Sequence, residues 1–391
     1  MSEQSEQSSG RKSASPSAEA GGEGGSSSSR SEMRRKALEE AEQEALEMME
    51  ESAARAQQWG GTSNALQGLL RKLGAGLDDL LPSVSASHGR LKTILSGLKT
   101  DDDCSQLAAL TELCEMLSIS TEESMSALSV DGFVPLLVQM LRKEHNADIM
   151  LLAARAMCHM MDAIPSSSAA IVHYDGVQLF CERLLSIEYI DLAEQSLSAL
   201  EKLSHEHPLA ILRAGGMLAV LQYVDFFATG VQRVAVSTAA NLCRGLPVEC
   251  AHLVGDAVPL LSQLLNHHDQ KVLENACLGF SRLVDAFSYA PSQLEMVAAH
   301  GLLPNLLRLL SGMVVGARAL DEAHVALSDA TYTMLLRTLA ALCRGSAALC
   351  VQLLSLDVCS LLHDVLAATD EGSARPHDQV FQLLSLANEL L

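Results

Sequence analysis

Three ten-residue stretches follow one pattern: GFVPLLVQML (132–141), DAVPLLSQLL (256–265) and GLLPNLLRLL (301–310). A glycine or aspartate opens each stretch, a proline follows three residues later, and paired leucines come next. Glycine suits a turn with positive φ, aspartate suits a helix cap, and proline is tolerated in a first helical turn. Each stretch therefore predicts the start of a short amphipathic helix.

Weaker copies of this pattern begin at residues 176, 216 and 357, so that successive starts lie 40 to 56 residues apart. A longer pattern rich in alanine and other small residues accompanies the copies, at 154–164, 194–204, 236–246, 277–287 and 337–347. Repeats of about 40–47 residues with two or three helices are typical of armadillo and HEAT arrays. We therefore predict an all-α, right-handed superhelical solenoid of the armadillo/HEAT type over residues 89–391, with about seven stacked units.

The ends of the array and one long gap need separate assignments. Residues 105–119 and 379–391 fit as incomplete first and last members, and Asp101–Asp103 should start the first of these helices because acidic groups favour a helix N-terminus. The long gap before the last unit predicts an insertion at 311–330, which we expect to be a loop with at most one extra helical turn.

The residues before the array divide into three segments. Residues 1–31 are rich in Ser, Gly and Glu and predict a disordered tail. Residues 32–58 predict a charged helix, either solvated or binding a partner. Leucines spaced by three and four predict an amphipathic cap over 64–88, with Pro82 ending its helix.

Composition restricts the class of protein. Hydrophobic residues make up 48% of the chain but aromatic residues only 3%, which favours helices packed on helices. Neither a membrane-spanning stretch nor a signal peptide is predicted. The net charge of −21 disfavours nucleic acid and anionic membranes as partners and suits basic peptide segments. We interpret the ten cysteines as reduced, mostly buried hydrophobes.

The helices of the alanine-rich pattern should line a concave groove, as the third helices of stacked repeats. Polar side chains that project into this groove are the candidate binding residues, although any solvated helix also has a polar face. They are Arg155, His159, Gln195, Asn241, Arg282 and Arg337.

No catalytic, cofactor-binding or metal site is predicted. His205, His207, His267 and His268 lie on expected turns, without cysteine partners at a spacing that would suit zinc. Cysteines that face a helical core lack the surroundings that lower a thiol pKa.

One stretch, VSTAANLCRG (236–245), resembles the third helix of importin-α-type armadillo repeats, with Asn241 at the groove asparagine. Those repeats carry a tryptophan four residues earlier, where this sequence has Ser237. The corresponding residues elsewhere are Arg155, Gln195, Leu278 and Arg337. Since that tryptophan ladder would grip lysine stems by cation–π contact, its absence argues against nuclear-import-receptor activity.

A longer resemblance covers roughly residues 60–391. NALQGLLRKLGAGLDDLLPS (64–83), LTELCEMLSISTEESMSALSVDGFVPLLVQML (110–141) and DIMLLAARAMCHMMDAIPSSSAAIVHYDGV (148–177) are similar to the armadillo region of plant HECT-type ubiquitin ligases that control trichome branching. Further similar stretches are 187–208, 226–244 and LANELL (386–391). The animal thyroid-receptor-interacting HECT ligase has a related region.

The resemblance implies a substrate-recruiting scaffold in ubiquitination and proteasomal degradation. A cysteine in a C-terminal HECT module of such ligases carries ubiquitin as a thioester and would receive it from the conjugating enzyme. No stretch here matches that module, so we expect this chain to be inactive alone and to bind protein substrates or basic peptide segments in its groove. The alternative is a free-standing armadillo adapter for protein–protein interaction. The expected location is the nucleus, the cytoplasm or both.

Overall fold

The computed structural model describes residues 82–119, 125, 128–315, 325–370 and 376–391. Ser83–Leu391 forms one compact unit, in which the described elements are α-helices and short 3-10 helices and include no β-strand. The predictions for the tail 1–31, the charged helix 32–58 and most of the cap segment 64–88 lie outside the described residues. No single described helix is long and apolar enough to cross a membrane, although Ala347–Ser355 and Val358–Ala367 pass that test as a pair bent by 68°.

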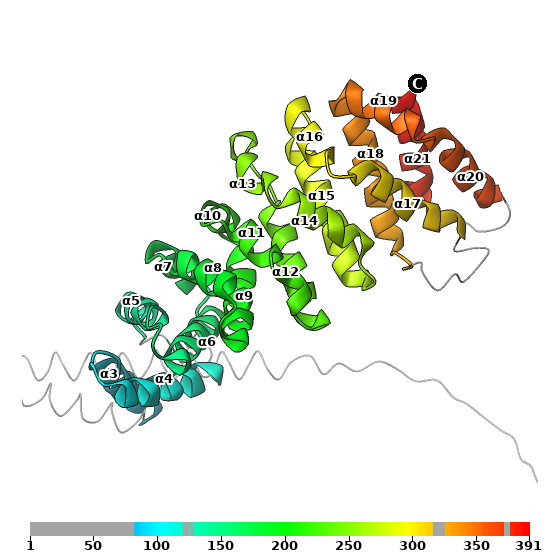
Figure 1. Cartoon of the computed structure of the whole chain (residues 1–391). Coiled ribbons are helices and arrows are strands. Elements are labelled where there is room, and N and C mark those ends of the chain that lie inside the picture. Colours follow the sequence, from blue (N-terminus) through cyan, green and yellow to red (C-terminus); the bar gives the residue numbers. More distant parts are fainter. Residues whose placement is uncertain (1–81, 120–124, 126–127, 316–324, 371–375) are drawn as a thin grey trace, which may run out of the picture. The chain divides into compact units, whose positions relative to one another are not determined.

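Long helices close the successive layers of the unit and alternate with shorter ones (Figure 1). We refer to these long helices as the third helices. They are α4 (Asp103–Ser118), α6 (Ala147–Ala163), α9 (Ile190–Ser204), α12 (Thr229–Leu242), α15 (Gln270–Ala286), α18 (Asp329–Gly345) and α21 (His377–Leu390).

The other elements, most of which are shorter, precede the third helices in each layer. The first layers contain α3 (Pro82–Leu98), α5 (Val130–Leu141), α7 (Ser167–His173), α8 (Gly176–Ser186), α10 (Pro208–Arg213), α11 (Gly216–Leu221) and η2 (Val224–Phe226). The later layers contain η3 (Val248–Cys250), α13 (His252–Gly255), α14 (Val258–Gln263), η4 (Leu264–Asn266), α16 (Pro291–Ala298), α17 (Leu302–Val315), α19 (Ala347–Ser355) and α20 (Val358–Asp370).

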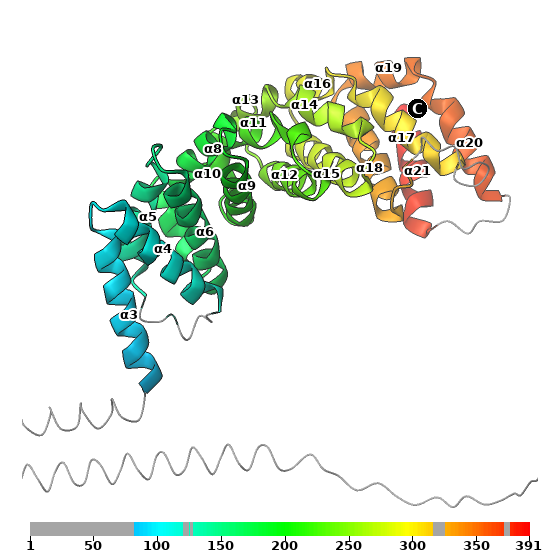
Figure 2. The same ribbon diagram turned by 60° about the horizontal axis from the view of Figure 1, so that its bottom comes forward.

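Each third helix packs against the next one along the chain, from α4 to α21. Figure 2 shows α6, α9, α12, α15, α18 and α21 on one side of the unit, with α5, α8, α11, α14 and α17 on the other. Small residues allow close stacking, as predicted. A Cβ added at Gly279 of α15 would lie 3.8 Å from Ala240 Cα of α12. The result is a continuous buried core and a continuous row of third helices.

The left-handed turn predicted where a short helix opens is present at two of the predicted residues: Gly301 before α17 has φ of +79°, and Asp357 before α20 has φ of +59°. Before α8 and α11 the left-handed residue comes one position earlier than predicted: Asp175 has φ of 61°, and Gly215 has φ of +75°. The following residue, Gly216, also needs the absence of a side chain because an added Cβ would lie 2.8 Å from the carbonyl oxygen of Ile211. These turns direct each short helix back onto the preceding layer.

The predicted start of the first third helix is confirmed. Asp102 is the N-cap of α4, and its carboxylate accepts hydrogen bonds from Ser105 N (2.9 Å) and Ser105 Oγ (2.6 Å). These bonds hold the pKa of Asp102 below its usual value. Asn146 caps α6 in a similar way, accepting from Ile149 N at 3.2 Å.

Two predicted positions differ from the structure. Helix α3 runs through the boundary predicted at 88/89. Pro135 lies in the second turn of α5, because Gly132 N and Phe133 N both donate to Ser129 O and start the helix earlier. Helix α17 continues to Val315, which agrees with one extra helical turn at the start of the insertion predicted at 311–330. The helix predicted to end at Pro82 lies outside the described residues.

Candidate protein-binding surface

Three positions of the third helices, spaced by four and then three residues, lie on one face of a helix. In α6 these positions hold Arg155, His159 and Asp162, of which Arg155 and Asp162 are exposed and His159 is half-buried. In α12 the first two hold Ser237 and Asn241, and Arg244 follows just beyond the end of the helix. The corresponding residues form three parallel tracks along the row; they are Leu278, Arg282 and Asp285 in α15 and Arg337, Ala341 and Arg344 in α18.

Two matching contacts fix how the first layers align. The thiol of Cys114 in α4 donates to Leu152 O in α6 at 3.5 Å, and the thiol of Cys158 in α6 donates to Gln195 O in α9 at 3.7 Å. Gln195 therefore corresponds to Leu152, one turn before Arg155. The residues of α9 that correspond to Arg155 and His159 are Ser198 and Lys202. The predicted alignment of Gln195 with Arg155 was wrong by three residues.

The structure buries Asn241, which the sequence placed on the groove surface. Its Nδ2 donates to Ser204 Oγ in α9 at 3.1 Å, and its Oδ1 accepts from Arg282 Nη1 in α15 at 3.2 Å. The side chain is only 9% exposed. Asn241 thus links three neighbouring third helices, and half of its hydrogen-bonding capacity is used within the unit.

Arg282 is half-buried beside Asn241. Its Nη1 also donates to Ala240 O at 2.5 Å. Burial lowers the pKa of this guanidinium, and the nearby charge of Arg244 lowers it further. Arg244 in turn donates through Nη2 to His205 O. Neither arginine is paired with a carboxylate among the described residues.

Arg337 is exposed and paired, unlike Arg282. Its Nη2 lies 3.0 Å from Asp285 Oδ2, and both side chains are more than half exposed, at 57% and 51%. Lys202, which sequence reasoning missed, pairs with Asp162 of the preceding third helix. Arg344, also missed, pairs with Glu389 at 2.8 Å. A correct alignment of α9 would have drawn attention to Lys202, whereas Arg344 lies at the third position of α18, seven residues after the predicted Arg337.

His159 lies between charges of both signs. Burial is the main reason that its pKa is lowered, while Asp162 acts in the opposite direction and the cations Arg155 and Lys202 lower the pKa further. Arg155 itself forms neither an ion pair nor a side-chain hydrogen bond within the described part of the chain. Helix α6 therefore contributes to the row a histidine with a lowered pKa, His159, and a guanidinium without an ion pair, Arg155.

The two halves of the central third helices differ in charge. From the first track position to two residues past the end of each helix, α6, α9, α12, α15 and α18 carry six cations and four anions. The cations, which we call the cationic strip, are Arg155, Lys202, Arg244, Arg282, Arg337 and Arg344. The N-terminal halves of the same helices carry five anions and two cations; the anions are Asp148, Asp191, Glu194, Glu274 and Asp329. The strip is therefore a cationic surface on a chain whose net charge is −21.

The cysteines predicted to be core residues are buried: Cys114, Cys158, Cys243, Cys277 and Cys343. Burial raises the pKa of Cys243 to about 12 and that of Cys158 to about 11. A thiol with such a pKa is almost entirely protonated at neutral pH and is a poor nucleophile. These buried thiols are therefore packing residues.

The histidines on the predicted turns hold local structure. His205 Nε2 lies 3.0 Å from Glu201 Oε1, and His207 Nε2 lies 3.4 Å from Ser168 Oγ. His267 Nδ1 accepts from Asp269 N at 3.0 Å. No group of three or more His, Cys, Asp or Glu side chains within the described residues could hold a metal ion.

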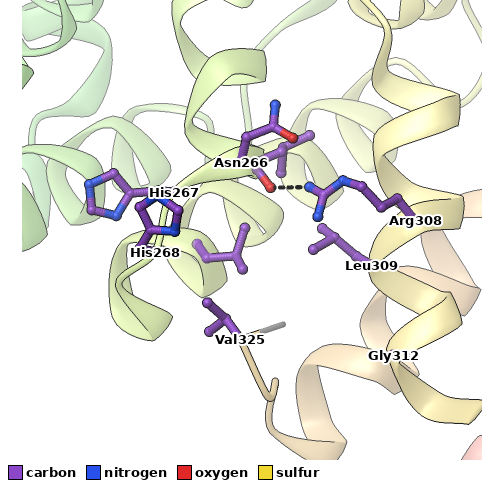
Figure 3. A pocket seen from close by; sticks show the side chains of 9 residues that line it. Asn266, His267, His268, Arg308, Leu309, Gly312 and Val325 are labelled. Carbon is purple, nitrogen blue, oxygen red and sulfur yellow. Dashed lines mark hydrogen bonds between the residues drawn. The ribbon is translucent and has the colours of Figure 1, made fainter. Parts of the chain in front are cut away.

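An open pocket of about 170 Å³ lies beside η4 and α17 (Figure 3). Its polar lining includes Arg308, which donates from Nη2 to Leu265 O at 2.7 Å, and the two histidines His267 and His268. Leu273, Leu309 and other apolar side chains complete the lining.

The row of third helices and its polar tracks define the class of protein: an armadillo-type helical-repeat protein. The structure is similar to a designed armadillo repeat protein that was solved in complex with the peptide (KR)4. The TM-score is 0.50 at 16% identity, and the match covers 63% of this chain and 98% of the designed one. This likeness shows the fold.

Sequence comparison gives the family. The sequence model described as "E3 ubiquitin-protein ligase TRIP12-like, TPR repeats" matches residues 2–213. The chain is 52% identical over 345 residues to the E3 ubiquitin-protein ligase UPL3 of Arabidopsis thaliana, covering 84% of this chain and 18% of UPL3. It is 37% identical over 316 residues to the E3 ubiquitin-protein ligase TRIP12 of Danio rerio, covering 78% of this chain and 15% of TRIP12. This chain belongs to the TRIP12-like family of E3 ubiquitin-protein ligases and spans less than a fifth of the length of these two relatives.

Proposed function

We propose that this chain recruits protein substrates for ubiquitination by a HECT-type ligase and thereby directs them to degradation. Membership of the ligase family supports the link to ubiquitin. The single observation that carries the recruiting role is the continuous row of third helices, which presents three tracks of largely polar side chains from α6 to α18. Such a surface can bind an extended segment of another protein over several repeats.

The buried side chains of the described residues suggest packing rather than chemistry. The buried cysteines have raised pKa values, and His205 and His267 on the turns bond to neighbouring groups. Cys104 and Cys359 are exposed, so the proposal that a HECT module carries out the transfer rests on the family and not on these thiols. In this proposal, the chain contributes selection of the substrate.

Competition with a complete ligase tests this proposal. Excess purified chain would be added to an extract of Arabidopsis cells, which supplies UPL3, and the proteins that co-purify with the chain would be identified. Their decay would then be followed after protein synthesis is stopped. We expect these proteins to decay more slowly, because the chain occupies them without supporting transfer. A designed armadillo repeat protein at the same concentration is the matched control.

The same experiment separates this function from that of a free-standing adapter. An adapter would capture proteins, but their decay would be the same with and without excess chain. That result, or the capture of no protein above the level of the designed control, would contradict substrate recruitment. Slowed decay of captured proteins in the presence of this chain alone would support it.

A further inference from the structure

Arg244 and Arg282 form a pair of cations without a carboxylate partner. Arg282 is held in place by Ala240 O and Asn241 Oδ1, and Arg244 by His205 O. All of these acceptors are uncharged. A half-buried charge that lacks an opposite charge lowers stability unless other groups compensate for its lost hydration. The pair is therefore placed to gain from an anion that arrives from outside.

Neighbouring charges extend this pair along the row. Arg155 has no ion pair among the described residues, and Arg337 shares its one carboxylate, Asp285, in an exposed pair that solvent screens. Lys202 lies between them in α9, paired with Asp162. The cationic strip therefore holds unpaired or weakly paired guanidiniums in α6, α15 and α18 and at the end of α12.

Helix stability does not account for the strip. Cations in the last turn of a helix are favoured by the helix dipole, which explains Lys202 and Arg344. Arg155 lies in the middle of α6 and Arg337 in the middle of α18, where the effect of the dipole is small. Their positions call for another explanation, and a binding role provides one.

We propose that the cationic strip binds an extended acidic segment of a partner protein, whose carboxylates pair with Arg244 and Arg282 and continue toward Arg155 and Arg337. The proposal rests on substrate recruitment and names the chemical class of the segment that is recruited. Guanidinium and carboxylate groups match in a planar, two-bond geometry, and such charge-assisted bonds are about twice as strong as neutral ones. The sign is opposite to that expected from net charge alone, because six cations but only four anions lie in, or within two residues after, the C-terminal halves of these third helices.

The spacing of the row suggests how an acidic segment would fit. Packed helices lie about 8–10 Å apart, and an extended chain rises about 3.3 Å per residue, so one repeat corresponds to about three residues of the segment. An acidic side chain at about every third residue could therefore meet the strip once per layer. Because the net charge of −21 repels polyanions at long range, binding requires this local pairing.

Peptide binding to the full chain tests the proposal. The probes are fluorescein-labelled peptides of equal length: one with Glu at every third position, its phosphoserine counterpart, its Lys counterpart and a Gln control. A single-stranded oligonucleotide of matched charge is a further probe. Fluorescence anisotropy is measured at low salt. We expect the Glu peptide to bind at least tenfold more tightly than the Gln and Lys peptides and the oligonucleotide. The phosphoserine peptide distinguishes a site for phosphate from one for carboxylate.

The decisive comparison uses two variants with the same change in net charge. R244E/R282E removes the pair, and R142E/R213E reverses two exposed arginines at the ends of α5 and α10. We expect R244E/R282E to weaken binding of the Glu peptide by at least tenfold and R142E/R213E to change it less than twofold. If R244E/R282E does not fold, as judged by thermal melting, R155E is used instead and should weaken binding at least threefold.

Several results would overturn the proposal. If both double variants lose the same affinity for the Glu peptide, the binding reflects bulk electrostatics. If the Lys peptide binds more tightly than the Glu peptide, the site is anionic in effect. If the phosphoserine peptide or the oligonucleotide binds more tightly than the Glu peptide, the site is one for phosphate. Failure of the Glu peptide to bind, while captured proteins still decay slowly in the competition experiment, would reject the acidic segment and leave substrate recruitment intact. If the Glu peptide binds but the chain has no effect on the decay of captured proteins, substrate recruitment is rejected and the binding of an acidic segment is kept.

Discussion

The N-terminal and C-terminal halves of the central third helices carry opposite charge, and the two halves use their arginines differently. In the N-terminal half, Arg233 of α12 forms two bonds to Asp269, Nε to Oδ1 at 3.0 Å and Nη2 to Oδ2 at 2.6 Å. In the C-terminal half, Arg282 and Arg244 bond to uncharged oxygens. Arg233 is thus neutralised by a carboxylate of the same unit, whereas the positive charges of Arg282 and Arg244 are not neutralised by any carboxylate among the described residues.

The difference shows which surface needs a partner. Asp148, Asp191 and Asp329 lie in the first turns of their helices, where acidic groups stabilise the helix itself. Asp269 is an N-cap as well as an ion-pair partner. Most charges of the N-terminal half thus have structural roles, whereas Arg155, Arg244 and Arg282 of the cationic strip have no carboxylate partner among the described residues. A surface whose groups are not satisfied internally is the better candidate for recognition.

The largest expected effect concerns the buried face on which both halves depend. Leu200 of α9 is fully buried, so Leu200→Asp would place an unpaired carboxylate between layers and destabilise the protein by about 3–5 kcal/mol. Ser198→Asp, on the half-exposed first track of the same helix, should cost less than about 1 kcal/mol. Urea unfolding followed by circular dichroism measures both. Equal effects would show that the alignment of α9 given above is wrong.

A smaller loss of stability is expected at the tight turn before α11, one of the short helices. Gly216→Ala would bring a Cβ to 2.2 Å from Ile211 Cγ2 and 2.8 Å from Ile211 O, which should cost about 1–3 kcal/mol. Gly230→Ala in α12 is the matched control, because nothing lies within 4 Å of its added Cβ. The control should leave stability unchanged or raise it by up to about 1 kcal/mol. Thermal melting of the two variants gives the comparison, and a stable Gly216→Ala protein would argue against the tight turn.

The sequence could predict the fold because its signals are local. Leucines at helical spacing, the turn residues before α8 and α11, and small residues in the third helices each act within a few residues. The same holds for Asp102, whose cap of α4 follows from its position ahead of Ser105. Repetition of these local signals was sufficient to define a stacked array.

The candidate site was harder to predict because it depends on neighbouring layers. In α9 the leucines Leu197, Leu200 and Leu203 fit two alignments, and only the contact between Cys158 and Gln195 O selects one. Asn241 is polar and was placed on the surface, yet Ser204 and Arg282 from two other helices bury it. Net charge likewise does not reveal that Arg155, Arg244 and Arg282 lie along one half of the third helices. Hydrogen-bond partners that come from other layers are far away in the sequence, so no local sequence pattern predicts them.

The pH dependence of the N-terminal half provides a sharper test of its internal pairing. The Arg233 guanidinium, together with backbone N–H groups of Lys271 and Val272, lowers the pKa of Asp269 to about 2. A lowered pKa in the folded state means that this carboxylate stabilises the protein above its unfolded pKa of about 3.9 and loses that effect as the pH falls through about 2. Asp269→Asn should therefore cost about 1 kcal/mol at pH 7 and have little effect near pH 2. Urea titrations at both values measure this, and a difference that grows toward low pH would contradict the pairing.

The smallest effect is expected at an exposed pair in the strip. Arg337 and Asp285 are both more than half exposed, so Arg337→Ala should lower stability by less than about 0.5 kcal/mol. The same variant should weaken binding of the Glu peptide at least twofold, because it removes one cation of the strip. A large loss of stability with unchanged binding would show that Arg337 is a structural residue, and would remove α18 from the proposed surface.

Site-specific cross-linking tests most directly whether partners bind on the C-terminal half of the third helices. A photoreactive phenylalanine would replace Ser237 in that half of α12, Thr229 at the N-terminal end of the same helix, or Gln222 after α11. The measured quantity is the yield of cross-links to captured proteins whose decay the chain slows. Our account predicts a high yield at residue 237 and low yields at 229 and 222. A higher yield at 222 than at 237 would contradict it, because the partners would then bind the side formed by the short helices.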